Sequence, residues 1–345
     1  MPELWYTTKK DPMRSYKSGA SRATFIALGG LLASAALVQV LARRAEKAHR
    51  PLGKILRVQG RAVHVVERGT GPCVVLLHGN GSMVEDFAST GLIDRLAENH
   101  RVVAFDRPGF GESDRDGGTW TPEREADLLA EVIQTLGVHT SVVVGHSWGA
   151  LVALSMALRD PASVTGLVLL SGYYYPTARL DVAIQTPASL PVIGQLVRYT
   201  LWPLAARLCA PAAFKFLFSP LKVPSAFRNA YSVPMATRPC QLKSFADDTV
   251  TMPTAAGHIC SRYGEIDVPV RLIAGVNDKV VSTQEQSERL NRDLKDCELQ
   301  LLEGVGHMSH HARPDLVVAA VDALFNADQH KTPAALTPND EKIPA

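Results

Sequence analysis

The sequence predicts an α/β protein with a mostly parallel, doubly wound sheet and a helical insertion that forms a cap. Two observations lead to this fold class. Apolar strand patterns alternate with helix patterns from about residue 54 to 326, and the alternation stops between about 173 and 264. Strands that alternate with helices form sheets covered on both faces. A chain of 345 residues is long enough to bury such a core.

The strand and helix patterns follow one another in a regular order. Residues 55–58 and 61–69 read as a hairpin of two half-exposed strands. Residues 72–79 contain a continuous apolar run, as in a strand buried on both faces, and 101–109 read as another buried strand. Between Thr121, placed as an N-cap before Pro122, and Gly137 a helix is expected. The other expected strands are 140–147, 164–172, 268–275 and 297–304, and the other expected helices are 84–98, 148–160, 283–295 and 314–326.

The alternation of strand and helix patterns divides the chain into a core and three further segments. The core comprises 51–172 and 265–326, and the cap comprises 173–264, which is rich in proline and aromatic residues and shows only short helical fragments. The polar, proline-rich segment 327–345 is expected to be a disordered tail. Aromatic residues of the cap could line an apolar substrate pocket or form the cap's own core; they are Tyr173, Tyr174, Tyr175, Trp202, Phe214, Phe216, Phe218, Phe227 and Tyr231.

The first 50 residues contain a candidate membrane anchor. Residues 23–42 carry no charge, and their length of roughly 20 residues matches the hydrocarbon core of a bilayer. We expect a single-pass N-terminal anchor; a cleaved signal peptide and an apolar helix docked on the protein remain the alternatives. Arg43 and Arg44 follow the run directly, without a small-residue cleavage site. Basic residues on both sides are too balanced to predict an orientation.

Composition and residue spacing do not indicate a nucleic-acid partner, a disulfide framework or a cofactor. The formal net charge of +2 does not point to nucleic acid. The five cysteines are scattered and lack metal-ligand spacing, so we expect unreactive or buried thiols rather than a disulfide framework. No phosphate-binding glycine loop and no metal site are apparent in the pattern. The sequence therefore predicts no cofactor.

A serine between two glycines follows one of the expected strands. Gly145, His146, Ser147, Trp148 and Gly149 fit G-x-S-x-G between a strand and a helix, the context that separates a nucleophile from a chance match. The flanking glycines allow a sharp turn that projects the hydroxyl. The sequence therefore predicts that Ser147 is a nucleophile, with a tight turn and an incidental serine as the alternative.

A serine hydroxyl needs a base to remove its proton. His307 follows the strand at 297–304, in a loop built by Gly304 and Gly306. His310 and His311 lie just beyond and remain the less favoured alternatives. The sequence therefore predicts His307 as the general base.

The base in turn needs a carboxylate that orients the imidazole. Asp278 follows the strand at 268–275 and is the favoured candidate. Asp267 precedes that strand, at the wrong end of the sheet. Asp247 and Asp248 lie in the cap and are expected to form a solvated face or a helix cap.

Two backbone N–H groups are expected to stabilise an oxyanion. One belongs to Trp148, the residue after the nucleophile. The other lies in the loop after the strand at 72–79, where Asn80 is favoured and Gly81 is the rival. Both expected donors lie at the same edge of the sheet as Ser147.

From about residue 55 to 326 the chain resembles the α/β-hydrolase superfamily. The resemblance rests on "HGNG", "DRPGFGES", "GHSWG", "GVND" and "GVGH", which occur in the order of that superfamily. It implies an α/β-hydrolase fold, the chain order Ser, Asp, His for the triad, and a structural role for Asp106. "HGN" and the tryptophan after the nucleophile are also similar to haloalkane dehalogenases, in which such Asn and Trp side chains hold the departing halide, and "DRPGFGES" is similar to epoxide hydrolases.

Both of those groups use an aspartate nucleophile, whereas this chain has Ser147. A serine that displaced a halide or opened an epoxide would leave an ether, which water does not cleave. We therefore expect acyl transfer: hydrolysis of a carboxylic ester with an apolar part, with amide, thioester or C–C bond hydrolysis and a non-catalytic binding protein as alternatives. Substrate contacts are expected from Gly79, His146, Trp202 and Tyr173.

Overall fold

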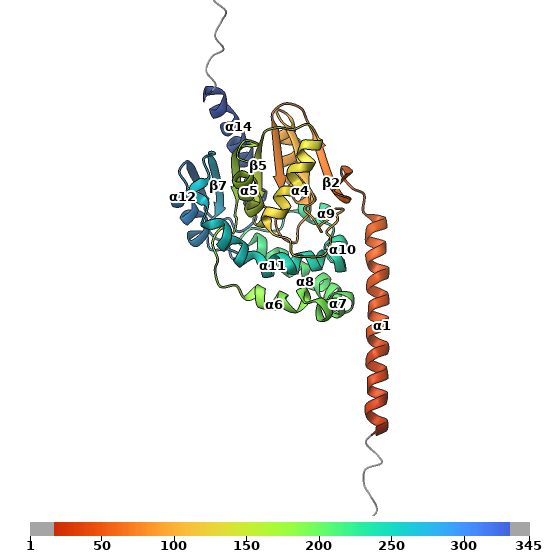
Figure 1. Ribbon diagram of the computed structural model, residues 1–345. Coiled ribbons are helices and arrows are strands. Elements are labelled where there is room, and N and C mark those ends of the chain that lie inside the picture. The colour runs from red at the N-terminus through yellow and green to blue at the C-terminus, as the bar shows by residue number, and fades with distance from the viewer. Residues whose placement is uncertain (1–16, 332–345) are drawn as a thin grey trace, which may run out of the picture.

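The computed structural model describes residues 17–331 and is built around an eight-stranded sheet (Figure 1). The strand order is β1-β2-β4-β3-β5-β6-β7-β8. The pairs β1–β2 and β2–β4 are antiparallel, and all later neighbours pair in parallel. The strands are β1 (Lys54–Val58), β2 (Arg61–Arg68), β3 (Cys73–Leu77), β4 (Arg101–Phe105), β5 (Ser141–His146), β6 (Val164–Leu170), β7 (Val270–Gly275) and β8 (Cys297–Leu302). The predicted fold class is confirmed.

Helices cover both faces of the sheet. Val75 and Leu77 of β3 lie in one core cluster with α4 (Pro122–Thr135) and α5 (Trp148–Arg159), whereas Val74 and Leu76 lie in a second cluster with α3 (Leu92–Ala97) and α14 (Pro314–Lys331). Successive side chains of a strand point to opposite faces. A strand covered on both faces must therefore be apolar throughout, which is why residues 73–77 show no alternation.

Local sequence signals place several element boundaries. The hydroxyl of Thr121 accepts a hydrogen bond from the backbone N–H of Arg124 at 3.3 Å, as expected of the N-cap of α4. The helix expected at 84–98 is instead two short helices, α2 (Glu85–Ser89) and α3, because Gly91 between them has φ 71°. A π-helical turn, Gln284–Glu288, precedes α12 (Arg289–Asp293).

The expected tail at 327–345 begins within a helix. Helix α14 continues to Lys331, five residues beyond the expected end at 326. The remainder, residues 332–345, lies outside the described residues, as do the basic residues before position 17.

The cap is helical, and two of its helices are long. Its members are α6 (Leu180–Ser189), α7 (Pro191–Tyr199), α8 (Trp202–Phe218), α9 (Ser225–Ala230), α10 (Val233–Ala236) and α11 (Pro239–Cys260). The expectation of short fragments is wrong for α8 with 17 residues and α11 with 22. Four prolines lie in the first turn of a helix, where a missing N–H costs no hydrogen bond: Pro191, Pro203, Pro234 and Pro239. These four prolines therefore mark helix starts, whereas Pro187, Pro211 and Pro253 lie inside α6, α8 and α11.

The three consecutive tyrosines belong to the core rather than to the cap. Tyr173, Tyr174 and Tyr175 are all buried in the cluster that contains α4 and α5. The side-chain oxygen of Gln286 accepts hydrogen bonds from the backbone N–H groups of Tyr174 and Tyr175 at 2.6 and 2.8 Å. The chain therefore stays on the core for several residues after β6 and enters the cap only at α6.

Other cap aromatics pack on one another. Phe227 contacts the rings of Phe214, Phe218 and Tyr231 at centroid distances of 5.0 Å. Phe218 and Phe227 also contact the His311 ring. This favours the cap's own core over a pocket lining for these residues.

The N-terminal segment forms one long helix, α1 (Lys17–Ala48), which passes the cap and extends beyond it (Figure 1). Its segment 22–48 has a mean hydropathy of 2.1 over the most apolar window. Within the described residues it is the single unbroken helix long and apolar enough to cross a membrane.

Replacing Gly149 by alanine should destabilise the fold by about 2 kcal/mol or more. A Cβ at this position would lie 2.2 Å from the carbonyl oxygen of Leu77, so α5 could not approach β3 as closely. Urea unfolding followed by circular dichroism measures the effect. The matched control is Gly264→Ala, because a Cβ there would have no atom within 4 Å. Equal stability of the two variants would contradict the close approach.

Candidate active site

Ser147 lies at a sharp turn between β5 and α5. Its backbone has φ 53° and ψ −115°, a positive φ that is unfavourable for a non-glycine residue. The turn is held by the backbone N–H of Ser147, which donates to the carbonyl of Leu170 at 3.0 Å. A Cβ at Gly145 would lie 2.4 Å from the carbonyl oxygen of Gly149. The two glycines therefore permit a strained turn that presents the serine side chain at the end of the strand.

His307 and Asp278 are in direct contact. The Nδ1 atom of His307 lies 2.7 Å from Oδ2 of Asp278. The other carboxylate oxygen accepts hydrogen bonds from the backbone N–H groups of Val280 and Val281 at 2.7 and 3.1 Å. These bonds fix the carboxylate and, through it, the ring of His307, which leaves the Nε2 edge to exchange a proton.

The turn at Ser147 meets the loop of His307 through the neighbouring His146. Nε2 of His146 lies 3.2 Å from the carbonyl oxygen of His307, and the two ring centroids are 5.0 Å apart. Burial and the nearby imidazoles of His310 and His307 hold the pKa of His146 well below its ordinary value. A neutral His146 ring can therefore donate from Nε2 to this carbonyl and position the loop of the predicted base.

The loop after β3 packs against Ser147. A Cβ at Gly79 would lie 3.1 Å from Cβ of Ser147. The side chain of Asn80 donates hydrogen bonds to the carbonyl of Phe245 at 3.1 Å and to the hydroxyl of Thr249 at 2.9 Å, both on cap helix α11. Gly79 and the Asn80 loop therefore line the serine, and the amide group of Asn80 is engaged with the cap.

Trp148 is the first residue of α5, so its backbone N–H has no acceptor within the helix. Its side chain is fully buried and donates from Nε1 to Oε1 of Glu125 at 3.1 Å. The N–H of the backbone is thus available near Ser147, whereas the indole N–H points into a buried ion-pair network.

That network was not anticipated from the sequence. Arg107 pairs with Glu125 at 2.8 Å and with Asp248 at 3.0 Å, and Arg115 pairs with Asp248 at 2.6 Å. Asp248 is completely buried, so the expectation of a solvated face or helix cap is wrong for this residue. Two guanidinium groups balance two carboxylates, which is what burial of charge requires. The network connects the sheet to α11 and holds the cap on the core.

Asp106 has the contacts of a structural residue. Its carboxylate lies 2.7 Å from Nδ1 of His64 and accepts hydrogen bonds from the backbone N–H groups of Val84 at 2.8 Å and Glu112 at 3.1 Å. A Cβ at Gly111 would lie 1.9 Å from this carboxylate. Asp106 therefore organises the loop after β4.

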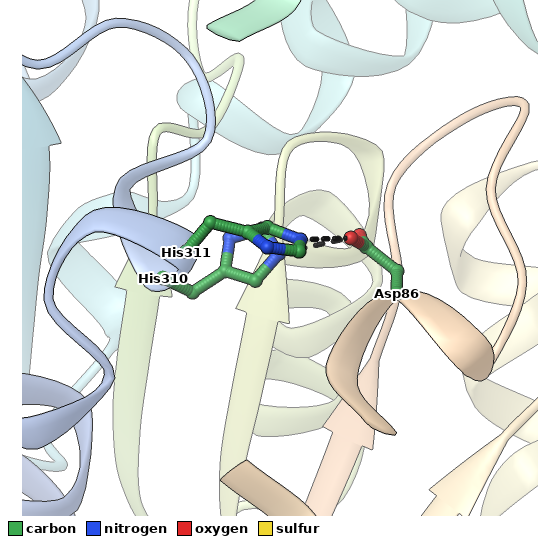
Figure 2. A group of neighbouring side chains, drawn as sticks. All are labelled: Asp86, His310 and His311. Carbon is green, nitrogen blue, oxygen red and sulfur yellow. Dashed lines mark hydrogen bonds and ion pairs between the residues drawn. The ribbon is translucent and has the colours of Figure 1, made fainter. Parts of the chain in front are cut away.

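Asp86, His310 and His311 form a second buried cluster (Figure 2). Asp86 of α2 faces His310 and His311 of α13 (Ser309–Ala312), at 3.3 Å to Nε2 of His310 and 2.7 Å to Nε2 of His311. Nδ1 of His146 lies 3.9 Å from the same carboxylate. One potential ligand atom from each of Asp86, His310 and His311, a carboxylate oxygen or a ring nitrogen, lies within 4.8 Å of the other two. A divalent cation could bridge this spacing.

The positions of the histidines determine the protonation of Asp86. Burial alone would raise the pKa of Asp86, but the imidazoles of His310 and His311 outweigh it and hold that pKa well below its ordinary value. Both histidines face Asp86, whereas His307 faces Asp278, which favours His307 among the three candidate bases. Because Asp86 and His310 are distant in the sequence, only their separate positions at strand ends could have suggested the contact.

The other predicted substrate residues are in different settings. The hydroxyl of Tyr173 accepts a hydrogen bond from the backbone N–H of Thr177 at 2.7 Å, and Arg179 lies over its ring at 5.0 Å. Trp202 opens α8 and is half-buried. Asp267 is exposed and pairs with Lys295 at the far end of β7. Substrate contacts by Tyr173, Trp202, Gly79 and His146 stay predictions.

Ser147 and His307 are both buried, at 8% and 4% exposure.

A family model described as "Alpha/beta hydrolase family" matches residues 74–320, which contain Ser147, Asp278 and His307. The chain belongs to the alpha/beta hydrolase family.

Similar proteins within and around this family carry different activities in their names. Haloalkane dehalogenase 2 of Mycobacterium tuberculosis is 24% identical over 275 residues, which cover 76% of this chain and 91% of that protein. A 2-hydroxy-6-oxononadienedioate/2-hydroxy-6-oxononatrienedioate hydrolase of Klebsiella pneumoniae is 27% identical over 268 residues, covering 76% and 88%. Among solved structures, a membrane phospholipase A described as a bacterial virulence factor has a TM-score of 0.58 and 19% identity, covering 92% and 99%.

Replacing Asp86 by asparagine should destabilise the hydrolase by about 2 kcal/mol at pH 7, because it removes the buried charged acceptor that Nε2 of His311 contacts at 2.7 Å. A depressed carboxyl pKa stabilises the fold above the unfolded value of about 4, and this stabilisation is lost as the pH falls through the folded pKa. The variant should therefore also lose less stability on acidification below pH 4 than the wild type does.

Urea unfolding at several pH values measures both effects. Asp315→Asn is the matched control, since Asp315 is an exposed partner of Arg313 and its removal should change stability little. An Asp86→Asn variant with wild-type stability and an unchanged acid limb would show that the cluster does not depend on this charge.

Proposed function

We propose that this protein is a membrane-associated serine hydrolase that cleaves a carboxylic ester with an apolar acyl or alcohol part. Two observations support the proposal: Ser147 stands at a strained strand-to-helix turn, and the adjacent His146 contacts the loop of His307, whose ring pairs with Asp278 at 2.7 Å. A serine hydroxyl at such a turn, a histidine and an orienting carboxylate are the groups that acyl transfer requires.

In the proposed reaction, Nε2 of His307 takes the proton from the hydroxyl of Ser147 as Oγ attacks the ester carbonyl. The tetrahedral oxyanion accepts hydrogen bonds from the backbone N–H groups of Trp148 and Asn80. His307 then protonates the departing alcohol, and an acyl group remains on Ser147. Water, deprotonated by His307, attacks the acyl carbon, the bond to Oγ breaks to release the acid, and His307 returns the proton to Ser147; Asp278 stabilises the imidazolium in both half-reactions.

Two contacts argue against the chemistry of the dehalogenase relative. Halide binding by Asn and Trp side chains would require free N–H groups, but the indole N–H of Trp148 is donated to Glu125 and the amide of Asn80 is donated to the cap. Ser147 also stands where a carboxylate nucleophile would be needed. The site residues thus support acyl transfer rather than displacement of a halide.

Hydrolysis of a C–C bond next to a carbonyl is the second candidate. It is favoured by the name of the Klebsiella relative and by a 2-hydroxymuconate semialdehyde hydrolase of Pseudomonas putida, 31% identical over 150 residues, which cover 42% of this chain and 53% of that protein. The same three residues could serve it. Turnover of 2-hydroxy-6-oxodienoates without turnover of p-nitrophenyl esters would favour this candidate.

For α1 we propose a membrane anchor. Residues 23–42 are uncharged, and the exposed side chains along α1 include Phe25, Ile26 and Leu32, which are 73%, 76% and 64% exposed. Apolar residues exposed around a helix of this length fit a lipid environment. A signal sequence remains the alternative for this segment.

Labelling with a fluorophosphonate probe tests the proposed nucleophile. The wild-type protein should incorporate one probe per chain, and Ser147→Ala should incorporate none. Asp278→Asn should react at least about 100-fold more slowly, because the imidazole loses its orienting charge. In-gel fluorescence measures the rates.

Ser155→Ala is the control, since the Ser155 hydroxyl donates to the carbonyl of Leu151 within α5. It should label at the wild-type rate. Equal labelling of the wild type and Ser147→Ala, or no labelling of either, would overturn the proposed nucleophile.

A further inference from the structure

The cap presents an uncharged surface where it faces away from the sheet. The exposed side chains of α7, the start of α8 and the residues between them are apolar or uncharged. Val192 is 81% exposed, Leu208 is 83% exposed and Leu201 is 64% exposed. Exposed apolar surface of this extent marks a binding surface in soluble and membrane proteins alike.

Charged groups are nearly absent from this part of the chain. Between positions 182 and 214 the only charged residues are Arg198 and Arg207. Arg198 is buried and donates to the carbonyl of Ala188 inside the cap. Arg207 donates to the hydroxyl of Thr237 at 2.8 Å. Neither guanidinium therefore interrupts the exposed apolar surface.

Helix α1 packs against the same part of the cap. A stripe of its residues at helical spacing, from position 31 to 45, is buried or half-buried, with Val38, Ala42 and Ala45 at 2%, 6% and 6% exposure. The hydroxyl of Ser34 donates to the carbonyl of Thr200, just after α7, at 3.0 Å. The N-terminal half of α1, by contrast, is exposed on all sides over 22–30.

This contact determines how deep the cap lies if α1 spans a bilayer. A span needs about 20 residues, and the uncharged run is 23–42. If Ala42 lies at the surface of the hydrocarbon, Ser34, eight residues earlier, lies about 12 Å below that surface. The hydrocarbon of one leaflet is about 15 Å thick. The carbonyl of Thr200, to which Ser34 donates, would then lie deep within that leaflet. The residues of α1 that are free of the cap are too few to span on their own. The helix can therefore cross the membrane only if the end of α7 is also immersed in lipid.

We propose that α7 and the first half of α8 are buried in the hydrocarbon of the leaflet that receives the C-terminal end of α1. The exposed Arg43, Arg44 and Lys47 then lie at the level of the lipid head groups, where cations are favourable. Arg207 lines the same cavity as Arg44 and Pro234 and donates to Thr237, so its guanidinium points from α8 toward the head-group side rather than into the hydrocarbon. The ligand of the surface is acyl-chain hydrocarbon.

This inference rests on the proposed anchor, and it specifies the substrate class. A cap that lies in the leaflet and covers Ser147 gives lipid-dissolved esters the shortest route to the site. Water-soluble esters would have to approach from the opposite side of the cap.

Depth-dependent quenching of a fluorophore tests the proposal on the full-length chain. Cys209 of α8 is an exposed native cysteine within the apolar surface. It is labelled with a nitrobenzoxadiazole maleimide in a Cys240→Ser background, and the protein is then placed in phosphatidylcholine–phosphatidylglycerol vesicles. Two further labels are introduced with Cys209 and Cys240 both replaced by serine: Leu32→Cys reports on α1, and Leu301→Cys, 41% exposed on edge strand β8, is the control.

Labels at Cys209 and Leu32→Cys should lose fluorescence to acyl-chain nitroxides and resist aqueous iodide. The label at Leu301→Cys should show the reverse, after subtraction of the signal from the variant without exposed cysteines.

Quenching of Leu32→Cys by nitroxide together with quenching of Cys209 by iodide would overturn the immersed cap while the anchor stands. Iodide quenching of Leu32→Cys would overturn the anchor and the inference with it. Nitroxide quenching of Leu301→Cys would show immersion of the whole protein and would contradict a cap-specific surface.

Discussion

The close approach of α5 to β3 is the constraint on which the rest of the structure depends. Gly149 brings the first turn of α5 against the carbonyl of Leu77, and Gly145 lets β5 turn into that helix. The price is the positive φ at Ser147. Because these close approaches bring the serine, the N-terminus of α5 and the loop after β3 into one small region, the two backbone N–H groups proposed to bind the oxyanion belong to the surroundings of Ser147.

Two buried charge networks hold the surroundings of this turn. Arg107 joins the sheet to Asp248 of the cap, and Asp86 joins α2 to the histidines of α13. Removing one partner of such a pair leaves an uncompensated buried charge, which is strongly destabilising. The arrangement therefore fixes the cap and the loop of His307 relative to Ser147. A site that depends on distances of a few tenths of an ångström requires such support.

The positions of the strands along the chain and the neighbours of the serine followed from local signals. Continuous apolar runs, the N-cap at Thr121 and the glycines around Ser147 are all readable from neighbouring residues. Asp278 and His307 were predicted because parallel strands end at one edge of a sheet, and they are in contact. The partners of Arg107, Asp86 and Asn80 were not predictable, because each contact joins residues far apart in the chain. Proline near the start of α8 and α11 was misread as irregular structure, since its position in a helix depends on where that helix begins.

The proposed catalytic residues of this hydrolase lie on the core, whereas the proposed membrane contacts lie on α1 and the cap. The central proposal is that Ser147 carries the acyl group between two half-reactions. Rapid mixing with p-nitrophenyl butyrate, an acid quench and mass spectrometry of the peptide that contains Ser147 tests this most directly. The account predicts a burst of nitrophenol and a butyryl group on Ser147. Turnover without a burst and without acylated Ser147, at times when product is already forming, would contradict it.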